Sequence, residues 1–290
     1  MSEFMQFLLS GLTVGAVYAL VALGFTIIYN ASDVANFAQG EFVMLGGMIT
    51  AAAYAVGVPL PLAALMAIIL TAGAGVLLNK LAIEPARGAP VVSLIIITIG
   101  ASIFIRGLVQ LVLGKQLHNI PAFTGDDPIR VLGATILPQS LWVIAGALGI
   151  FFLLWLFFNH TLTGRAVLAT ANNRIAALLV GINTNYIMTL SFAVSAAIGA
   201  LAGVLVTPIT LTSYDIGMTM ALKGFAAAML GGMGNPKGAL VGGIALGILE
   251  AMTAGYISSQ YKDAAAFIMI LAVLFFMPQG LFGSKQMERV

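Results

Sequence analysis

Long apolar segments separated by short polar breaks dominate the sequence. A helix needs about 20 mostly apolar residues to cross the hydrocarbon core of a bilayer, because each residue rises about 1.5 Å through roughly 30 Å. The pattern predicts up to nine such segments: residues 5–29, 40–56, 60–79, 91–113, 140–159, 186–207, 217–234, 238–256 and 264–282. The second and seventh are short and contain glycine, so eight full spans with one re-entrant or broken piece also fit. The pattern therefore predicts an all-α, polytopic transmembrane helical bundle.

Composition strengthens this prediction. Hydrophobic residues make up 61% of the chain and charged residues 8%, whereas a soluble domain carries about a quarter charged residues. We interpret residues 1–290 as a single transmembrane domain, with an external loop at 114–139 and a cytoplasmic segment at 161–184. The first apolar segment is expected to be a span and not a signal peptide, because it is long and no basic region precedes it. The absence of cysteine and the presence of two histidines leave no thiolate or histidine-based metal site.

The positions of lysine and arginine predict the orientation. With an external N-terminus, the cytoplasmic loops hold Lys80, Arg87, Arg165, Arg174, Lys237, Lys285 and Arg289, and the outer loops hold Lys115, Arg130 and Lys262. This excess of basic residues inside favours an external N-terminus and a cytoplasmic C-terminus. The basic residues are scattered singly and form no patch, so we expect no nucleic-acid partner.

A short internal repeat indicates how the halves of the bundle are related. The string Met44-Leu-Gly-Gly-Met48 recurs as Met229-Leu-Gly-Gly-Met233. In the predicted topology, the first copy runs outward and the second inward. Inverted-topology repeats of this kind enclose a solute path near the bilayer midplane. The alternative is chance recurrence of three residue types that are common in this chain.

Polar side chains at the second apolar segment are candidates for a solute path. A charge deep in lipid costs roughly 2.5–3.5 kcal/mol, so such residues usually face the bundle interior or a wet cavity. We expect Asn36, Gln39 and Glu41 to border the path, because a broken helix there would offer amides and free backbone groups.

Four further charged residues lie within or beside the apolar segments: Arg106, Asp215, Lys223 and Glu250. Arg106 either contacts a substrate carboxylate or extends its long stem to the headgroups. Lys223 likewise either extends outward or faces a polar cavity on the path. Glu250 lies so deep that we predict a structural role with a buried basic partner or a bound proton.

The segment after the fifth span has a helical pattern. Within residues 163–181, the apolar residues Val167, Ala171, Ile175 and Leu178 recur at helical spacing, Arg165 and Asn172 fall on the other face, and Gly181 is a natural stop. The pattern predicts one short amphipathic helix on the cytoplasmic side. By itself, such a helix is typical of a segment lying in the membrane interface.

The amino-acid sequence of this segment resembles that of a known protein family. Gly164-Arg-Ala166, Ala171-Asn-Asn-Arg174 and Leu178-Leu-Val-Gly-Ile-Asn183 are similar to the coupling segment of the branched-chain (hydrophobic) amino-acid uptake ABC permeases. Residues 34–41, 84–90, 222–239 and 247–250 resemble further motifs of that family, in the family's order and over nearly the whole chain. Two positions depart from it, since Gln39 stands where relatives often carry His and Arg106 where they are usually uncharged.

The resemblance implies a bacterial inner-membrane permease that pairs with a second permease subunit. It also implies two cytoplasmic ATP-binding subunits, an external solute-binding protein and contact with membrane lipid. Residues 164–181 would dock into the ATPase, with Arg165, Val167, Asn172, Arg174, Leu178 and Gly181 as candidates for coupling. No cofactor is expected on this chain, and Mg-ATP would be bound by the partner ATPase.

Other function classes fit less well. Gly234-Asn-Pro-Lys-Gly238 lacks the spacing and the Ser/Thr ending of a phosphate-binding loop. No paired catalytic Asp, Ser–His pair or metal-binding His motif falls within the spans, so the chain is not expected to be an enzyme. An ion-coupled secondary transporter is the alternative, because inverted repeats and buried carboxylates fit it as well. We predict an importer subunit for hydrophobic amino acids or related small amphiphilic solutes; small amides, urea and aromatic acids stay open as substrates.

Overall fold

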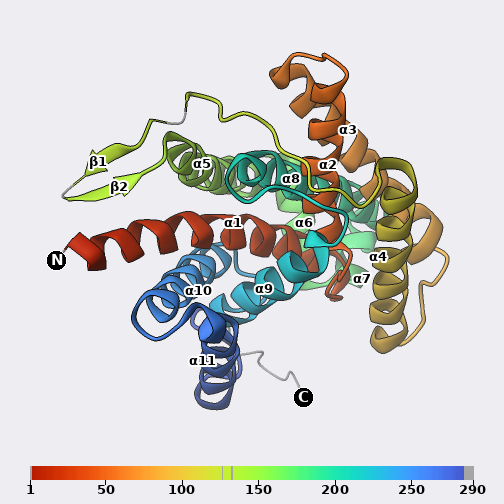
Figure 1. The fold of residues 1–290 in the computed structure, drawn as a ribbon. Helices are drawn as coiled ribbons and strands as arrows, with labels where there is room; N and C mark the ends of the chain where they lie inside the picture. The colour runs from red at the N-terminus through yellow and green to blue at the C-terminus, as the bar shows by residue number, and fades with distance from the viewer. Residues whose placement is uncertain (1, 126, 132, 284–290) are drawn as a thin grey trace.

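The structure, a computed structural model, describes residues 2–125, 127–131 and 133–283. Figure 1 shows a bundle of helices with one small hairpin at its edge. The helices are α1 (Ser2–Ser32), α2 (Gln39–Ala55), α3 (Leu60–Leu78), α4 (Val91–Leu113), α5 (Pro138–His160), α6 (Leu162–Asn172), α7 (Arg174–Leu179), α8 (Thr184–Thr210), α9 (Ile216–Gly231), α10 (Pro236–Tyr256) and α11 (Lys262–Phe276). A π-helical turn extends α3 through Asn79–Ile83, and a 3-10 turn, Ser259–Tyr261, precedes α11.

Six of the described helices are long and apolar enough to cross a membrane, namely α1, α3, α4, α5, α8 and α10. The shorter helices α2, α9 and α11 have 17, 16 and 15 residues. This confirms the prediction of a membrane protein built from many apolar helices.

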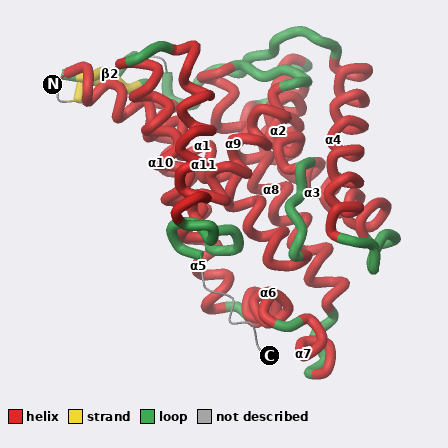
Figure 2. Tube along the Cα trace, turned by 90° about the horizontal axis from the view of Figure 1, so that it is seen from below, coloured by secondary structure: helices red, strands yellow, loops and turns green. Residues whose placement is uncertain are grey.

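The stretch predicted as an external loop at 114–139 contains two strands that the all-α prediction missed. Strand β1 (Ile129–Val131) pairs antiparallel with β2 (Ala134–Ile136), with Arg130 opposite Thr135. The Gln6 amide of α1 fixes the hairpin, because its Nε2 donates to the Thr135 carbonyl at 3.0 Å and its Oε1 accepts from the Thr135 N–H at 2.8 Å. In Figure 2 this hairpin lies at the end of the bundle opposite α6 and α7.

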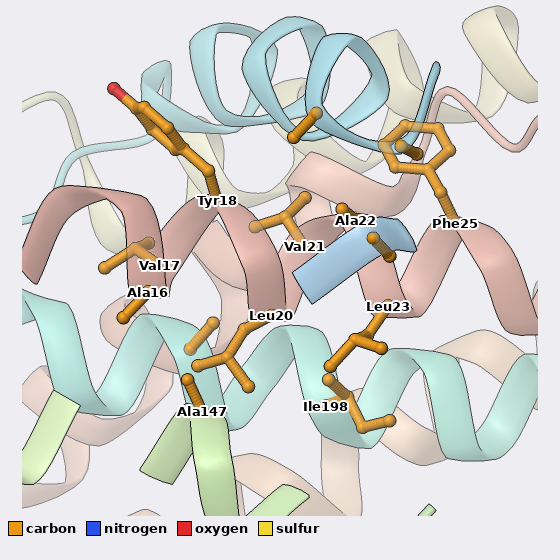
Figure 3. Packing of buried hydrophobic residues seen from close by; sticks show 14 of the residues in the cluster. Ala16, Val17, Tyr18, Leu20, Val21, Ala22, Leu23, Phe25, Ala147 and Ile198 are labelled. Atoms are coloured by element: carbon orange, nitrogen blue, oxygen red, sulfur yellow. The ribbon is translucent and has the colours of Figure 1, made fainter. Parts of the chain in front are cut away.

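Helix α1 forms the centre of the bundle. Of its most apolar 18 residues 89% are buried, against 11% for α4, so α1 is a core helix and α4 a peripheral one. Figure 3 shows Leu20 and Leu23 of α1 packed toward Ala147 of α5 and Ile198 of α8. On another side of α1, glycines allow close approach of α10: a Cβ on Gly15 would lie 2.8 Å from the Ile244 Cα. The glycines at spacing four therefore let α1 and α10 pack closely, as pairs of small residues do between helices in membranes.

The two short helices α2 and α9 meet at their first turns. A Cβ added to Gly40 would collide with the Gly217 carbonyl, and the neighbouring Ala221 N would be 2.6 Å away. Residues 33–38 bring the chain from the end of α1 to this point, and residues 211–215 do so from the end of α8. Helix α2 thus begins inside the molecule, and the first turn of α9 packs on it through the buried Gly217 while Met218 is exposed.

Three predicted boundaries are wrong. The span predicted at 217–234 ends at Gly231, because Gly232 and Gly234 adopt φ values of 101° and 90°. The span predicted at 264–282 ends at Phe276, since a turn through Pro278 and Gly280 stops the helix. The single helix predicted within 163–181 is two helices, α6 and α7.

The break between α6 and α7 lies at Asn173. Its backbone is extended, and its side-chain oxygen accepts from the Ala176 N–H at 2.9 Å. Asparagine is among the best residues for starting a helix in this way. The hydrophobic periodicity of the sequence continues across Asn173, so it gave no sign that a second helix, α7, begins there.

Candidate functional site

Glu41 and Arg106, predicted separately as candidates for the path, form an ion pair. Glu41 lies in the first turn of α2 and is fully buried. Its Oε1 accepts from the Ser102 hydroxyl at 2.8 Å and from the Arg106 Nη2 at 2.8 Å. Arg106 therefore reaches inward to a carboxylate and does not extend to the headgroups.

One face of α4 carries the polar side chains of this site. Thr98, Ser102 and Arg106 recur at spacing four, so they stack on the same side of an otherwise apolar helix. The Thr98 hydroxyl accepts from the Phe37 N–H at 3.2 Å, in the break before α2. The opposite side of α4 exposes Ile103 and Phe104. The spacing was visible in the sequence, and it is the signal that could have placed Arg106 toward α2.

The pair is only partly satisfied by hydrogen bonds. Within the described residues, Glu41 Oε2 and Arg106 Nε are buried without a hydrogen-bond partner. Oε2 lies against Gly217, in the first turn of α9, where an added Cβ would contact the carboxylate. The first turns of two helices present free N–H groups and the positive ends of their dipoles, which favours a negative charge here. A buried acceptor without a donor remains costly.

The other two candidates of the second segment differ from Glu41. Gln39 is fully buried, its Oε1 accepts from the Ser195 hydroxyl at 2.6 Å, and its Nε2 donates to the Ser195 carbonyl at 3.2 Å. Gln39 thus joins α2 to α8 through both ends of its amide. Asn36 accepts from the Ala38 N–H at 3.1 Å, while its Nδ2 has no partner among the described residues. Asn36 therefore keeps a free polar group, and Gln39 does not.

Glu250 has the buried basic partner that its depth predicted. Its Oε1 pairs with the Lys223 ammonium, and its Oε2 accepts from the Tyr18 hydroxyl at 2.7 Å. Lys223 also pairs with Asp263 of α11 at 2.8 Å. The Lys223 side chain is 11% exposed and pairs with both carboxylates, so of its two predicted alternatives the structure does not show the outward extension. This cluster joins α1, α9, α10 and α11, and sequence reasoning missed Tyr18 and Asp263 in it.

The residues predicted to couple to an ATPase divide into buried and exposed ones. Val167 of α6 is 2% exposed and packs within its own chain, near Ile27 and Leu154, so it presents no docking surface. The most exposed apolar residues of 164–181 are on and just after α7, namely Ile175, Leu178, Leu179 and Val180, and Leu168 of α6 is 37% exposed. Arg165, Asn172 and Arg174 are exposed as well, and Gly181 ends α7 with a φ of 86°.

A cavity of about 750 Å³ lies beside α6. It is lined by Tyr29, Asn30, Asp33, Leu168, Ala171, Asn172, Met229, Met233, Gly234, Asn235, Pro236, Pro278, Gln279, Phe282 and Gly283. Burial raises the pKa of the Asp33 carboxyl above its usual value, and the Arg174 guanidinium opposes this shift. The cavity thus joins the end of α1, the turn between α9 and α10, and the segment after α11 at one end of the bundle.

The similarity of this chain to known proteins extends over nearly its whole length. Residues 7–274 match the family model described as "Branched-chain amino acid transport system / permease component". The chain is 34% identical to the high-affinity branched-chain amino acid transport system permease protein LivH of Salmonella typhimurium, over 99% of this chain and 98% of that protein. It is 35% identical to the corresponding protein BraD of Pseudomonas aeruginosa, with the same coverage.

A solved structure, PsaBC from Streptococcus pneumoniae in complex with Fab, is similar over 97% of this chain and 92% of that chain, with a TM-score of 0.47 and 13% identity. That likeness is too distant to bear on function. The family match and the two relatives extend over nearly the full length, including both charge clusters, α6 and α7. The chain belongs to the family of branched-chain amino acid transport system permease components, and is a membrane transport subunit of that family.

Proposed function

We propose that this chain is the membrane-spanning permease subunit of an ATP-driven importer for branched-chain or other hydrophobic amino acids. The observation that carries this proposal is the similarity to LivH and BraD, at 34% and 35% identity over 99% of the chain. Related small amphiphilic solutes belong to the same substrate class. The solute path runs between this chain and a second permease subunit.

The energy for import comes from partners. The sequence has no phosphate-binding loop, so two cytoplasmic ATP-binding subunits supply ATP hydrolysis and hold the Mg-ATP. They dock at α7, whose exposed Ile175, Leu178 and Leu179 fit an apolar groove on a partner. An external solute-binding protein delivers the solute at the end of the bundle that carries the β1–β2 hairpin.

The chain crosses the inner membrane of a bacterium in nine segments, with its N-terminus outside and its C-terminus in the cytoplasm. The residues 284–290, and with them Lys285 and Arg289, lie outside the described residues. Helices α2 and α9, with 17 and 16 residues, are the short partners in an inverted repeat. The meeting of their first turns supports this, because broken helices in such repeats begin near the midplane.

The solute path follows the polar face of α4 toward the break before α2. Glu41, Arg106 and Asn36 border it, since each has a polar atom without a partner among the described residues. Gln39 and Lys223 serve the structure of the bundle instead, because their polar groups are engaged within the chain.

Purification of the intact complex tests this proposal. A tagged form of this chain, extracted in mild detergent, should retain a second permease subunit and an ATPase. The cognate solute-binding protein, screened against amino acids, small amides, urea and aromatic acids, should bind leucine-like amino acids. A chain that transports leucine as a single subunit, without an ATPase, would contradict it.

A further inference from the structure

The cavity of about 750 Å³ beside α6 is large enough to hold a small molecule, since ligand pockets range from about 300 to 1,000 Å³. Two asparagines hold its walls together. The Asn30 Nδ2 donates to the Gly234 carbonyl at 2.9 Å, and the Asn235 Nδ2 donates to the Phe282 carbonyl at 3.1 Å. These bonds tie the end of α1 and the segment after α11 to the turn between α9 and α10. The cavity is therefore built by contacts between distant parts of the chain, away from the polar face of α4.

Three helices end at this cavity. Tyr29 and Asn30 lie in the last turn of α1, Ala171 and Asn172 in the last turn of α6, and Met229 in the last turn of α9. The last turn of a helix presents free carbonyl groups and the negative end of the helix dipole, which favours a positive charge. The helix ends therefore make the cavity favourable for a cation.

The start of α10 also borders the cavity, and a free helix start would favour an anion instead. This start is already capped, because the Asn235 Oδ1 accepts from the Lys237 N–H at 3.0 Å and from the Gly238 N–H at 3.3 Å. Asparagine is among the best residues for this role. These two donors are therefore not free to bind an anionic ligand.

Asp33 is the one charged side chain in the cavity lining, among the described residues. Its backbone φ is 56°, a conformation for which glycine is the usual residue after a helix, so the turn itself does not require a carboxylate. Within the described part of the chain Asp33 forms no ion pair. Burial raises the pKa of its carboxyl more than the Arg174 guanidinium lowers it. A carboxylate that lacks a counter-charge in this way is stabilised by a bound cation.

The same cavity offers apolar contacts. Leu168, Met229, Met233 and Phe282 belong to its lining. Methionine side chains are flexible and adapt to different apolar shapes. The lining thus combines one negative charge with an adaptable apolar surface, which suits a ligand that has a positive group and an apolar body.

We propose that this cavity binds a small organic cation, with its ammonium group at Asp33 and its apolar body on Met229, Met233 and Phe282. A ligand there contacts α6 and α1 at once, so it links the predicted coupling segment to the core of the bundle. The inference goes beyond the proposed function, because this site lies apart from the proposed solute path and its occupation requires no transport.

Three probes of similar shape test which charge the cavity selects. 2-Phenylethylamine carries an ammonium group, 2-phenylethanol is its neutral counterpart, and 3-phenylpropanoate is an anion. Each is titrated into the purified permease–ATPase complex by isothermal titration calorimetry. The wild type should bind the amine roughly tenfold or more tightly than the alcohol, and the carboxylate more weakly still, because a charge-assisted hydrogen bond adds to affinity.

Three variants assign the binding to this cavity. Asp33→Asn removes the charge, keeps the side-chain shape and suits the positive φ, so it should fold normally, weaken the amine roughly tenfold and leave the alcohol unchanged. Asp127→Asn, which removes an exposed acid from the 114–139 stretch, is the matched control and should bind all three probes as the wild type does. Ala171→Phe places a large side chain in the cavity and should weaken the amine and the alcohol alike.

A wild-type complex that binds the amine no better than the alcohol, or an Asp33→Asn complex that keeps the preference for the amine, would overturn the inference. The permease alone and a chain that ends at Gly283 are titrated in parallel. Amine binding that disappears when the ATPase is present would assign the cavity to a basic side chain of that partner. Amine binding seen only with the shortened chain would assign it to Lys285 or Arg289, and either result rejects the inference.

Discussion

Buried charges in this chain occur in pairs, and the pairs join helices that are distant in sequence. Glu250 of α10 bonds to Tyr18 of α1, 232 residues away, and to Lys223 of α9. The cost of an isolated charge in lipid was enough to predict that Glu250 has either a basic partner or a bound proton. Nothing in the local sequence could identify Lys223, because the pairing depends on how α9 and α10 pack.

Glu250→Gln should lower thermal stability more than it changes substrate preference. The substitution leaves Lys223 with Asp263 alone, which is 53% exposed. Loss of one partner from a buried pair typically costs about 3–5 kcal/mol, and the remaining contact places this case toward the lower value. The melting temperature of the purified permease measures it, and Glu250→Gln/Lys223→Met should recover most of the loss. A stable Glu250→Gln protein with altered selectivity would place Glu250 on the solute path.

At the scale of helices, hydrophobic periodicity located most of the spans. It did not locate the ends of α9 and α11 or the break between α6 and α7. The ends of α9 and α11 depend on Gly232 and Gly280, whose positive φ values stop helices that an apolar count continues. The division of α6 from α7 depends on the cap made by Asn173. Val167 belonged to the predicted docking stripe, yet it packs inside the bundle, near Ile27 of α1 and Leu154 of α5.

Replacing Leu178 and Leu179 by Asp should weaken assembly with the ATPase. These side chains are 53% and 83% exposed, so the change should not disturb the permease itself. In a docked complex it would bury unpaired charge, which is unfavourable. The measurements are retention of the ATPase on a tagged permease and substrate-stimulated ATP hydrolysis. Gln116→Asp, at the other end of the bundle, is the control. If the double variant retains the ATPase and hydrolyses ATP as the wild type does, α7 is not the docking surface.

Helix α10 should tolerate no larger residue where it crosses α1. A Cβ on Gly247 would collide with the Gly15 backbone, so Gly247→Ala forces the two helices apart. Overpacking of this kind typically costs about 1–3 kcal/mol. Gly73→Ala in α3 is the matched control, because nothing lies within 4 Å of its Cβ position. Thermal unfolding in detergent should show a loss for Gly247→Ala only; equal melting temperatures would contradict the packing.

For the molecule as a whole, the sequence was sufficient to predict a helical membrane protein and its family, because apolar length and motif order carry that information. The meeting of α2 and α9 at their first turns was not predictable, since no local pattern specifies which helices approach. The inverted repeat and the orientation are our proposals for how these helices are placed in the membrane.

The proposed orientation predicts that the two ends of the bundle label from opposite sides. The chain contains no cysteine, so single cysteines report position without background. Gln116→Cys, after α4, should react with an impermeant reagent added outside intact cells. Asn172→Cys, at the end of α6, should react only after the membrane is opened; both side chains are exposed in the structure. Labelling of both from one side would refute the orientation.

Import driven by ATP is the central claim, and uptake by the reconstituted complex measures it most directly. Proteoliposomes that hold this chain, its second permease subunit and the ATPase are supplied with loaded solute-binding protein and radiolabelled leucine. The account predicts accumulation that requires ATP and persists after proton and sodium gradients are dissipated. Accumulation that follows an ion gradient without ATP would contradict it and establish the secondary transporter instead.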